Sequence, residues 1–375
     1  MILVLNAGSS SLKYALLDPG TTAGQRGSVE RIPDHRSALA QALGELQLDP
    51  GAVRAVGHRV VHGGARFTRP TLVDDAVLAE LRRLSVLAPL HNPPALQAIE
   101  AARHLLPGTP HVAVFDTAFH ASLPAVAATY AIDTGVAGKH GIRRYGFHGI
   151  SCGYVARRTA SLLDRPLMTV NLIVLHLGNG GSATAVHGGR SVETSMGFTP
   201  LEGLVMGTRS GDIDPAIVTY LQREAGMGAA EVDDLLTRRS GLYGLAGDND
   251  VRSVLQAREA GDERAALAIE IYCHRIRKYV GAYHAVLGRL DAIVFTAGVG
   301  EHAAPVRALS LQGLEPWGVA VDPARNNAPD EDARVISAPD ARVAVCVVPT
   351  DEQAAIAMDV SQWLSGTDRE ESEDR

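Results

Sequence analysis

Two glycine- and serine-rich turns, each preceded by an apolar strand-like run, carry residues suited to binding phosphate. Residues 6–13 read Asn-Ala-Gly-Ser-Ser-Ser-Leu-Lys, and residues 176–182 read His-Leu-Gly-Asn-Gly-Gly-Ser. Small residues let backbone N–H groups approach an anion closely, and Lys13 adds a point charge to the first turn. The first turn does not fit the Walker A pattern GxxxxGK[ST]. We predict that the two turns hold a polyphosphate together.

Two arginines in glycine-flanked segments could grip carboxylate or phosphate groups. Arg59 lies in a β-like segment bounded by glycines, and Arg209 lies in a Gly/Ser loop over 206–212. A guanidinium offers paired donors that match either anion, although each arginine taken alone is also compatible with an ordinary surface position. His58 and His62 stand four residues apart, but the glutamate of a zinc-binding HExxH motif is missing, so no metal is predicted there.

Apolar strands that end in polar or glycine-rich residues alternate with helical segments. Strands are expected at 2–5, 13–17, 112–115, 172–176, 183–186, 293–295 and 343–348, and helices at 75–86, 94–104, 215–224, 230–239, 262–287 and 352–364. This alternation predicts an α/β fold with sites at strand ends. Residues 4–8 match residues 174–178 in spacing, which indicates two related halves. Residues 298–303 fit GxGxxA, but their place near the C-terminal end favours a nucleotide-contacting turn over a dinucleotide fold.

Composition limits the classes of protein that the chain can represent. Its 375 residues suggest two domains, and 46% hydrophobic residues exclude wholesale disorder. The net charge of −7 does not favour nucleic-acid binding, and three widely spaced cysteines fit a reducing cytosol. We expect no signal peptide and no membrane helix, because no apolar run is long enough. The tail after Leu364 holds no apolar residue and is predicted to be disordered from about residue 365.

The sequence resembles the acetate kinase family, within the acetate/propionate/butyrate kinase group of the actin–Hsp70–sugar kinase superfamily. The segments that carry the resemblance are 6–13 and 193–215, with 57–64, 87–94, 115–120, 145–149, 176–180 and 350–352 in order. The resemblance implies two duplicated RNase H-like (actin-like ATPase) domains with a nucleotide cleft between them, over 1–118 with 354–375 and over 119–353, which carries most nucleotide contacts. It also implies a cytoplasmic homodimer that uses ATP, acetate and Mg²⁺, with Mn²⁺ as a substitute, and that binds neither nucleic acid nor membrane.

The resemblance further implies which residues form the site. Catalysis would use Asp116, His148 and Arg209, and the metal would be held by Asn6 and Glu352. Acetate would be bound by Arg59, Val61, Leu90, His91, Phe147 and Pro200. ATP would be contacted by Ser9, Ser11, Lys13, His176, Leu177, Gly178, Asn179, Gly180, Asp250, Val251, Arg252, Gly298, Val299, Gly300, Glu301 and His302. The departures from the family pattern are His302 in place of an asparagine, unusual residues at 151–153 and 246–252, and a short stretch between Lys13 and Arg59.

The chemistry of the implied reaction modifies one of these roles. Family resemblance assigns Asp116 proton transfer, but acetate, with a pKa near that of glutamate at about 4.3, is already ionised at neutral pH. We therefore predict that Asp116 orients an arginine or the hydrated metal. Two alternatives remain open: a propionate or other short-chain carboxylate kinase, and a non-catalytic actin/Hsp70-like ATP-binding module.

Overall fold

The computed structural model describes residues 1–8, 11–18, 23–32, 34–47, 50–89, 91–329 and 332–373. Two of the predicted site residues, Ser9 and Leu90, therefore lie outside the described part. The chain forms two compact units, and each is described by itself. The first unit comprises Met1–Ala121, Gly149–Tyr154 and Asp351–Arg375, and the second comprises Ser122–His148 and Val155–Thr350.

The first unit is built on a mixed six-stranded sheet in the order β3-β2-β1-β4-β6-β5. Its strands are β1 (Ile2–Ala7), β2 (Ser11–Leu17), β3 (Gly24–Glu30), β4 (Ala55–Val60), β5 (Thr71–Leu72) and β6 (His111–Phe115). The first three strands pair antiparallel, whereas β1, β4 and β6 run parallel to one another. The ends of these three parallel strands therefore meet at one edge of the sheet.

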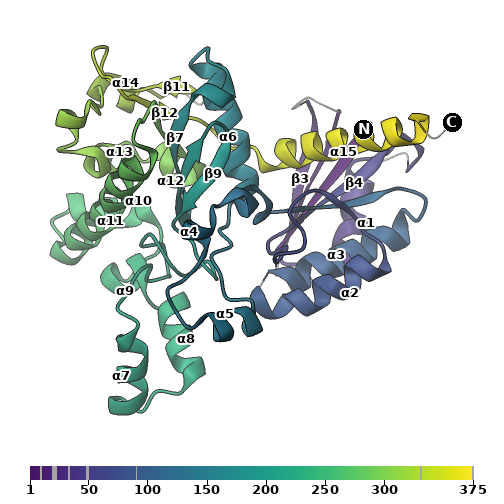
Figure 1. Ribbon diagram of the computed structural model, residues 1–375, viewed down its shortest axis with the longest axis horizontal. Coiled ribbons are helices and arrows are strands. Elements are labelled where there is room, and N and C mark those ends of the chain that lie inside the picture. The colour runs from purple at the N-terminus through teal and green to yellow at the C-terminus, as the bar shows by residue number, and fades with distance from the viewer. Residues whose placement is uncertain are drawn as a thin grey trace. The chain divides into compact units, whose positions relative to one another are not determined.

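Helices cover both faces of this sheet (Figure 1). They are α1 (His35–Glu45), α2 (Asp75–Leu84), α3 (Asn92–Leu105) and α15 (Glu352–Glu373), with short 3₁₀ turns at Pro50–Ala52, Ser85–Leu87 and Ala118–Ser122. Leu3 and Leu5 pack with α1 and α3 on one face. On the opposite face a Cβ built on Gly57 would lie 2.7 Å from Ile356 of α15, so only a glycine lets this helix pack so closely.

The second unit repeats the topology of the first, with strand order β11-β12-β10-β7-β8-β9. Its strands are β7 (Asn171–Leu177), β8 (Gly181–His187), β9 (Arg190–Thr194), β10 (Ala292–Thr296), β11 (Arg334–Val335) and β12 (Ala344–Val347). Here β7, β10 and β12 are parallel, while β7, β8 and β9 pair antiparallel, as β1, β2 and β3 do. The duplication predicted from residues 4–8 and 174–178 is confirmed.

The longest helix of the second unit, α11 (Glu263–Leu287), packs against β7 and β8. The other helices are α4 (Ala125–Ala128), α5 (Thr134–His140), α6 (Gly149–Leu162), α7 (Ala216–Glu224), α8 (Ala229–Arg238), α9 (Gly241–Ala246), α10 (Val251–Glu259), α12 (Ala297–His302), α13 (Ala304–Leu311) and α14 (Pro323–Asn327), with 3₁₀ turns at Leu167–Thr169 and Glu315–Trp317. The first residues of α6 belong to the first unit and the rest to the second. The core of the second unit joins Ile173 and Leu175 to Ile269, Tyr272 and Ile276 of α11.

The predicted helices all form, within a few residues of their predicted bounds at most ends, but one end differs. Helix α15 continues to Glu373, whereas the composition predicted disorder from about residue 365. A helix nucleated on packed residues such as Ile356 and Val360 extends readily, because each further residue that is fixed gains one hydrogen bond and no new nucleation is needed. Among the described residues, no helix is both long enough and apolar enough to cross a bilayer.

Candidate functional site

In the first unit, the guanidinium of Arg59 is bound by two carboxylates. Its Nε and Nη2 donate to the two carboxylate oxygens of Asp116 at 3.1 and 2.7 Å, and its Nη1 lies 3.2 Å from Oε2 of Glu352. The Asp116 side chain is 2% exposed, whereas those of Arg59 and Glu352 are each 20% exposed. A two-pronged pair of this kind fixes orientation as well as charge. Arg59 is therefore held in one pose while part of its side chain stays accessible.

The charges of this cluster do not balance within the protein. Burial raises the pKa of Asp116, against the Arg59 guanidinium, which lowers it, and Glu352 raises it further. Burial would lower the pKa of Arg59, but the carboxylates of Asp116 and Glu352 outweigh that effect and raise it. Two carboxylates beside one guanidinium leave a net negative charge when all three groups are ionised. A cation next to Glu352 would offset it.

The ends of the strands and the start of α15 bring these three side chains together. Arg59 stands near the end of β4, and Asp116 directly follows the parallel neighbour β6. Glu352 is the first residue of α15, whose N-terminus is capped by Asp351, which accepts a backbone N–H of the first turn at 2.9 Å. Arg26 of β3 donates to both carboxylate oxygens of Asp351 at 2.9 and 2.7 Å. The sheet therefore fixes the helix start and, with it, Glu352.

The first small-residue turn joins β1 to β2 in the same unit. The Gly8 N–H donates to the carbonyl oxygen of Ser11 at 2.8 Å and closes the turn. Asn6 lies opposite Lys13 in the antiparallel register, so the two side chains share one face of the hairpin. Lys13 is exposed and Asn6 is half-buried. This face offers an amide oxygen and an ammonium group to a ligand.

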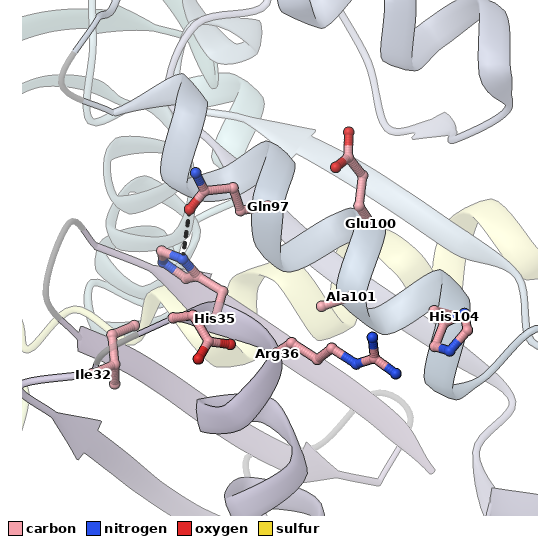
Figure 2. Close-up of a pocket in the computed structure, with 8 residues that line it drawn as sticks. Ile32, His35, Arg36, Gln97, Glu100, Ala101 and His104 are labelled. Carbon is pink, nitrogen blue, oxygen red and sulfur yellow. Dashed lines mark hydrogen bonds between the residues drawn. The ribbon is translucent and has the colours of Figure 1, made fainter.

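A cavity of about 510 Å³ lies in the first unit, outside the predicted site, and one of the residues that line it contacts this turn. Its lining is Ile32, Asp34, His35, Arg36, Gln97, Glu100, Ala101 and His104, none of which is a predicted site residue. Figure 2 shows the His35 ring directed toward Gln97 of α3. The His35 Nε2 lies 3.0 Å from the carbonyl oxygen of Gly8, and Nδ1 lies 2.9 Å from the Gln97 Oε1. His35 thus joins α3 to the first turn.

In the second unit, His148 and Arg209 converge on the second small-residue turn. The His148 ring stacks on His176 with centroids 4.1 Å apart, and its Nδ1 lies 3.0 Å from Oγ of Ser182. A Cβ built on Gly180 would lie 3.4 Å from Nη2 of Arg209 and 3.6 Å from Nε2 of His148. His148 also has a φ of 58°, in the left-handed region that residues other than glycine adopt rarely. Such backbone conformations cluster at functional sites.

Arg209 is a half-buried cation without an ion pair among the described residues. Its Nη1 donates to the carbonyl oxygen of Pro200 at 2.9 Å. Burial lowers the pKa of the guanidinium, although arginine remains charged at neutral pH. A partly buried charge that lacks a carboxylate partner is costly to the protein alone. An anionic ligand such as a phosphoryl group would remove this cost.

The second turn is tied to the loop that carries Arg209. The Asn179 carbonyl accepts the Gly207 N–H at 3.0 Å, and a Cβ on Gly207 would lie only 2.1 Å from Oδ1 of Asn179. The same Oδ1 accepts Nδ2 of Asn249 at 3.3 Å. Asp250 follows, caps α10 and pairs with Arg252 at 2.6 Å. The predicted ATP contacts at 176–180 and 250–252 are therefore joined through one asparagine.

Residues 298–302 lie in helix α12 rather than in an open turn. The Glu301 Oε1 accepts the N–H of Ala297 at 2.8 Å and the N–H of Thr350 at 3.1 Å. Ala297 itself has a φ of 64°, again in the left-handed region. The Glu301 carboxylate thus bridges the residues that follow β10 and β12. Its side chain is engaged within the protein, so we expect this segment to meet a nucleotide through its other atoms.

The predicted ATP contacts among the described residues differ in their exposure to solvent. The exposed ones are Lys13, Asn179, Arg252, Gly298 and His302; the half-buried ones are Ser11, Gly178, Gly180, Asp250, Val299 and Glu301; the buried ones are His176, Leu177, Val251 and Gly300. Of the predicted acetate-binding residues, Val61 is half-buried and His91 exposed in the first unit, while Phe147 is buried and Pro200 half-buried in the second. That these four line an acetyl-sized pocket stays a prediction.

Sequence reasoning missed the polar residues that hold the 193–215 segment. Arg144 pairs with Glu202 at 2.6 Å, and Tyr130 donates to the same carboxylate. Asp212 accepts the N–H of Gly203 at 2.8 Å. The available signal was the presence of acidic residues in a glycine-rich loop. The partners of Glu202, which are Arg144 and Tyr130, lie far away in sequence, so spacing could not identify them.

Buried histidines near Arg59 predict a loss of stability in acid. Burial lowers the pKa of His62 to about 4, and it lowers the pKa of His58 well below 6.5, where the neighbouring His111 adds to the effect. The Gly64 N–H donates to Nδ1 of His62 at 2.9 Å, and this bond is lost when Nδ1 takes up a proton. Below pH 6.5 the unfolded chain binds protons that the folded chain does not, so stability falls as pH falls toward 4.

We expect His62 alone to account for about 2 kcal/mol of stability lost between pH 7.5 and pH 5. Chemical denaturation at both pH values measures this difference. His62→Asn keeps an acceptor for Gly64 but cannot titrate, so its stability should fall by less over the same interval. An equal fall in both proteins would contradict the assignment.

The repeated sheets, each with a small-residue turn after its first strand, define a duplicated actin-like α/β protein. Two named relatives are similar to this chain over nearly its whole length. The acetate kinase of Streptomyces avermitilis is 55% identical over 95% of this chain and 95% of its own, and that of Streptomyces coelicolor is 54% identical with the same coverage. Residues 20–358 match the Acetokinase family. The chain belongs to the acetokinase family and is a kinase.

Solved structures agree with this assignment. A crystal structure of Porphyromonas gingivalis acetate kinase superposes with a TM-score of 0.91 at 39% identity, covering 97% of this chain and 99% of that one. A propionate kinase from Francisella tularensis gives a TM-score of 0.89 at 40% identity, with coverages of 96% and 98%. The expected fold class is therefore confirmed. The two solved structures are named for different substrates, acetate and propionate.

Proposed function

We propose that this protein is an acetate kinase, which reversibly transfers the γ-phosphoryl group of ATP to acetate and forms ADP and acetyl phosphate. The relatives at 54–55% identity carry that name. The observation that carries the proposal is the pair of guanidiniums: Arg59 held by two carboxylates, and Arg209 without an ion pair among the described residues. Acetate and the γ-phosphoryl group are both anionic. The reaction therefore needs one cation that fixes the carboxylate and another that takes up charge from the transferring group.

The proposed reaction is a direct displacement. A carboxylate oxygen of acetate attacks the γ-phosphorus, and the bond from that phosphorus to the β–γ bridging oxygen breaks, with its electron pair leaving on ADP. Acetate is ionised at neutral pH, so no base is needed. Arg59 would bind the acetate carboxylate in the pose that Asp116 sets. Arg209 and His148 would take up charge from the transferring group.

We propose Asn6 and Glu352 as ligands of Mg²⁺, with Mn²⁺ as a substitute. Both offer oxygen donors, which these hard cations prefer, and the excess negative charge around Arg59 favours a cation there. Among the described residues, no cluster of three or more His, Cys, Asp or Glu side chains could hold a metal. Kinase Mg²⁺ is usually held by one or two protein groups and by substrate phosphates. When bound, the ion would neutralise phosphate charge.

Turnover with a panel of short acids tests the proposed function. We expect hydroxylamine to trap an acyl hydroxamate when ATP, Mg²⁺ and acetate are supplied, with kcat/KM falling from acetate to propionate to butyrate. Each added methylene should change kcat/KM by about 10- to 200-fold, as apolar pockets generally discriminate. A propionate optimum would assign the chain to the propionate kinases, which the Francisella structure keeps as the second candidate.

The same assay separates catalysis from nucleotide binding. A non-catalytic actin/Hsp70-like module would bind ATP and form no hydroxamate with any acid. A sample heated beyond its thermal midpoint is the control for uncatalysed acylation. Absence of hydroxamate from folded protein that binds ATP would end the proposal.

We also propose that the protein acts as a cytoplasmic homodimer. Its functional domains would comprise 1–118 with 354–375 and 119–353, close to the two compact units. Family membership supports the assembly, and the three buried free cysteines suit a reducing compartment. Light scattering during size-exclusion chromatography tests the dimer.

A further inference from the structure

The loop that carries Arg209 is closed at its neck. The Gly203 N–H donates to Oδ1 of Asp212 at 2.8 Å, and the Asp212 N–H donates to the Gly203 carbonyl at 3.0 Å. Gly211 has a φ of 67°, and a Cβ there would lie 2.3 Å from the carbonyl oxygen of Leu204. The chain therefore leaves and returns at one point, with Arg209 in between.

Two side chains of α11 hold this neck from outside the loop. Arg275 Nη1 donates to the carbonyl oxygens of Gly203 and Asp212 at 3.0 and 3.2 Å. The Tyr279 hydroxyl donates to Oδ2 of Asp212 at 2.8 Å. Arg275 and Tyr279 stand four residues apart and so project from the same side of the helix. Burial and the Asp212 carboxylate raise the pKa of Tyr279, so its hydroxyl keeps the proton that it donates.

The tip of the loop is fixed in a different way. Ser210 N–H donates to the Leu236 carbonyl, and Ser240 N–H donates to the Thr208 carbonyl, both at 3.0 Å. These two are backbone bonds, and the Thr208 hydroxyl adds one side-chain bond to the Thr237 carbonyl at 3.0 Å. At the neck, apart from the backbone bond from Asp212 to Gly203, the bonds depend on the side chains of Asp212, Arg275 and Tyr279. A change of side chain in α11 should therefore reach Arg209 through the neck.

We propose that Asp212, Arg275 and Tyr279 are positioning residues that hold Arg209 in the pose required for phosphoryl transfer. The proposal rests on the proposed function, because it assigns these residues an effect on the charge that Arg209 supplies. A guanidinium on a long flexible stem stabilises a transition state only when its direction is set in advance. None of the three touches the reacting atoms in this proposal.

Tyr279→Phe tests the proposal with a matched control on the same helix. Tyr272 is a second tyrosine of α11, buried where Tyr279 is half-buried, and its hydroxyl has no hydrogen-bond partner among the described residues. We expect Tyr279→Phe to lower kcat about tenfold with KM for ATP and acetate within twofold, and Tyr272→Phe to leave kcat within twofold. Asp212→Asn, which keeps an oxygen for Gly203 and loses the charge, should act in the same direction as Tyr279→Phe.

A double-mutant cycle shows whether the effect passes through Arg209. When Arg209 is already alanine, Tyr279→Phe should produce no further fall in kcat, whereas a general structural defect would multiply with it. Multiplying effects, or equal losses in the two Tyr→Phe variants, would overturn the inference. If folded wild-type protein forms no hydroxamate, the proposed function itself fails. If hydroxamate forms but Arg209→Ala keeps wild-type turnover, only the role of Arg209 and the inference that rests on it fail, so the two failures are distinguishable.

Discussion

Arg209→Ala should lower kcat by about 10³- to 10⁵-fold and leave KM for acetate and ATP within a few-fold. That loss is the range seen when an arginine that stabilises a transferring phosphoryl group is removed. The structure supplies the reason: the guanidinium lies by Gly180 and His148 and has no ion pair among the described residues. Its charge is therefore available to the reacting group. Steady-state rates in both directions measure the effect.

The fold should survive this substitution. Removing a half-buried charge that lacks an ion pair relieves a desolvation cost, so the thermal midpoint should stay constant or rise. Arg239→Ala is the control, because Arg239 is an exposed arginine of the same unit that pairs with Asp234 at 2.7 Å. Its turnover should match wild type. A loss of affinity for acetate with unchanged kcat would reassign Arg209 to ground-state binding.

The duplicated fold could be predicted from the sequence because strands and turns have recognisable local sequence patterns. Residues 4–8 and 174–178 share a strand followed by a glycine, and the structure places both runs in the same position of sheets with the same order. The helices with clear apolar periodicity, such as α2 and α11, were predicted correctly. Helix α6 was not, since Gly149, Ser151 and Gly153 give its first turns low helix propensity, and burial of residues such as Val155 stabilises it instead.

The site could be predicted only in part, because many of its contacts join segments that are far apart in sequence. Residue types and family resemblance indicate that Arg59 and Asp116 matter, but only the parallel pairing of β4 with β6 shows that the carboxylate grips the guanidinium with both oxygens. Likewise, four helices and most of a fifth separate Tyr279 from Asp212 along the chain, and no local pattern connects them. Contacts made by tertiary structure between distant segments leave no periodicity to detect.

Arg59 supplies the second large expected effect. Arg59→Ala should raise KM for acetate about 10- to 100-fold, the value of a hydrogen-bonded charge pair, with a smaller effect on kcat. Arg59→Lys should fall in between, because it keeps the charge and loses the paired donors. Saturation curves in acetate at fixed ATP measure the change. Removing Arg59 also leaves Asp116 buried without its cation, so a thermal midpoint must accompany the kinetics.

Asp116→Asn separates orientation from proton transfer. If Asp116 orients Arg59, the amide of the variant can still accept one of the two hydrogen bonds, so KM for acetate should rise about tenfold. This rise should be the same at every pH from 5 to 9. A proton donor or acceptor would instead remove one limb of the pH–rate profile. Glu352→Gln is the paired variant: it keeps the grip of Asp116 on Arg59 but should raise the Mg²⁺ concentration needed for half-maximal rate. Because the two carboxylates share one guanidinium, only their different responses to acetate and to Mg²⁺ can show that one serves the substrate and the other the metal.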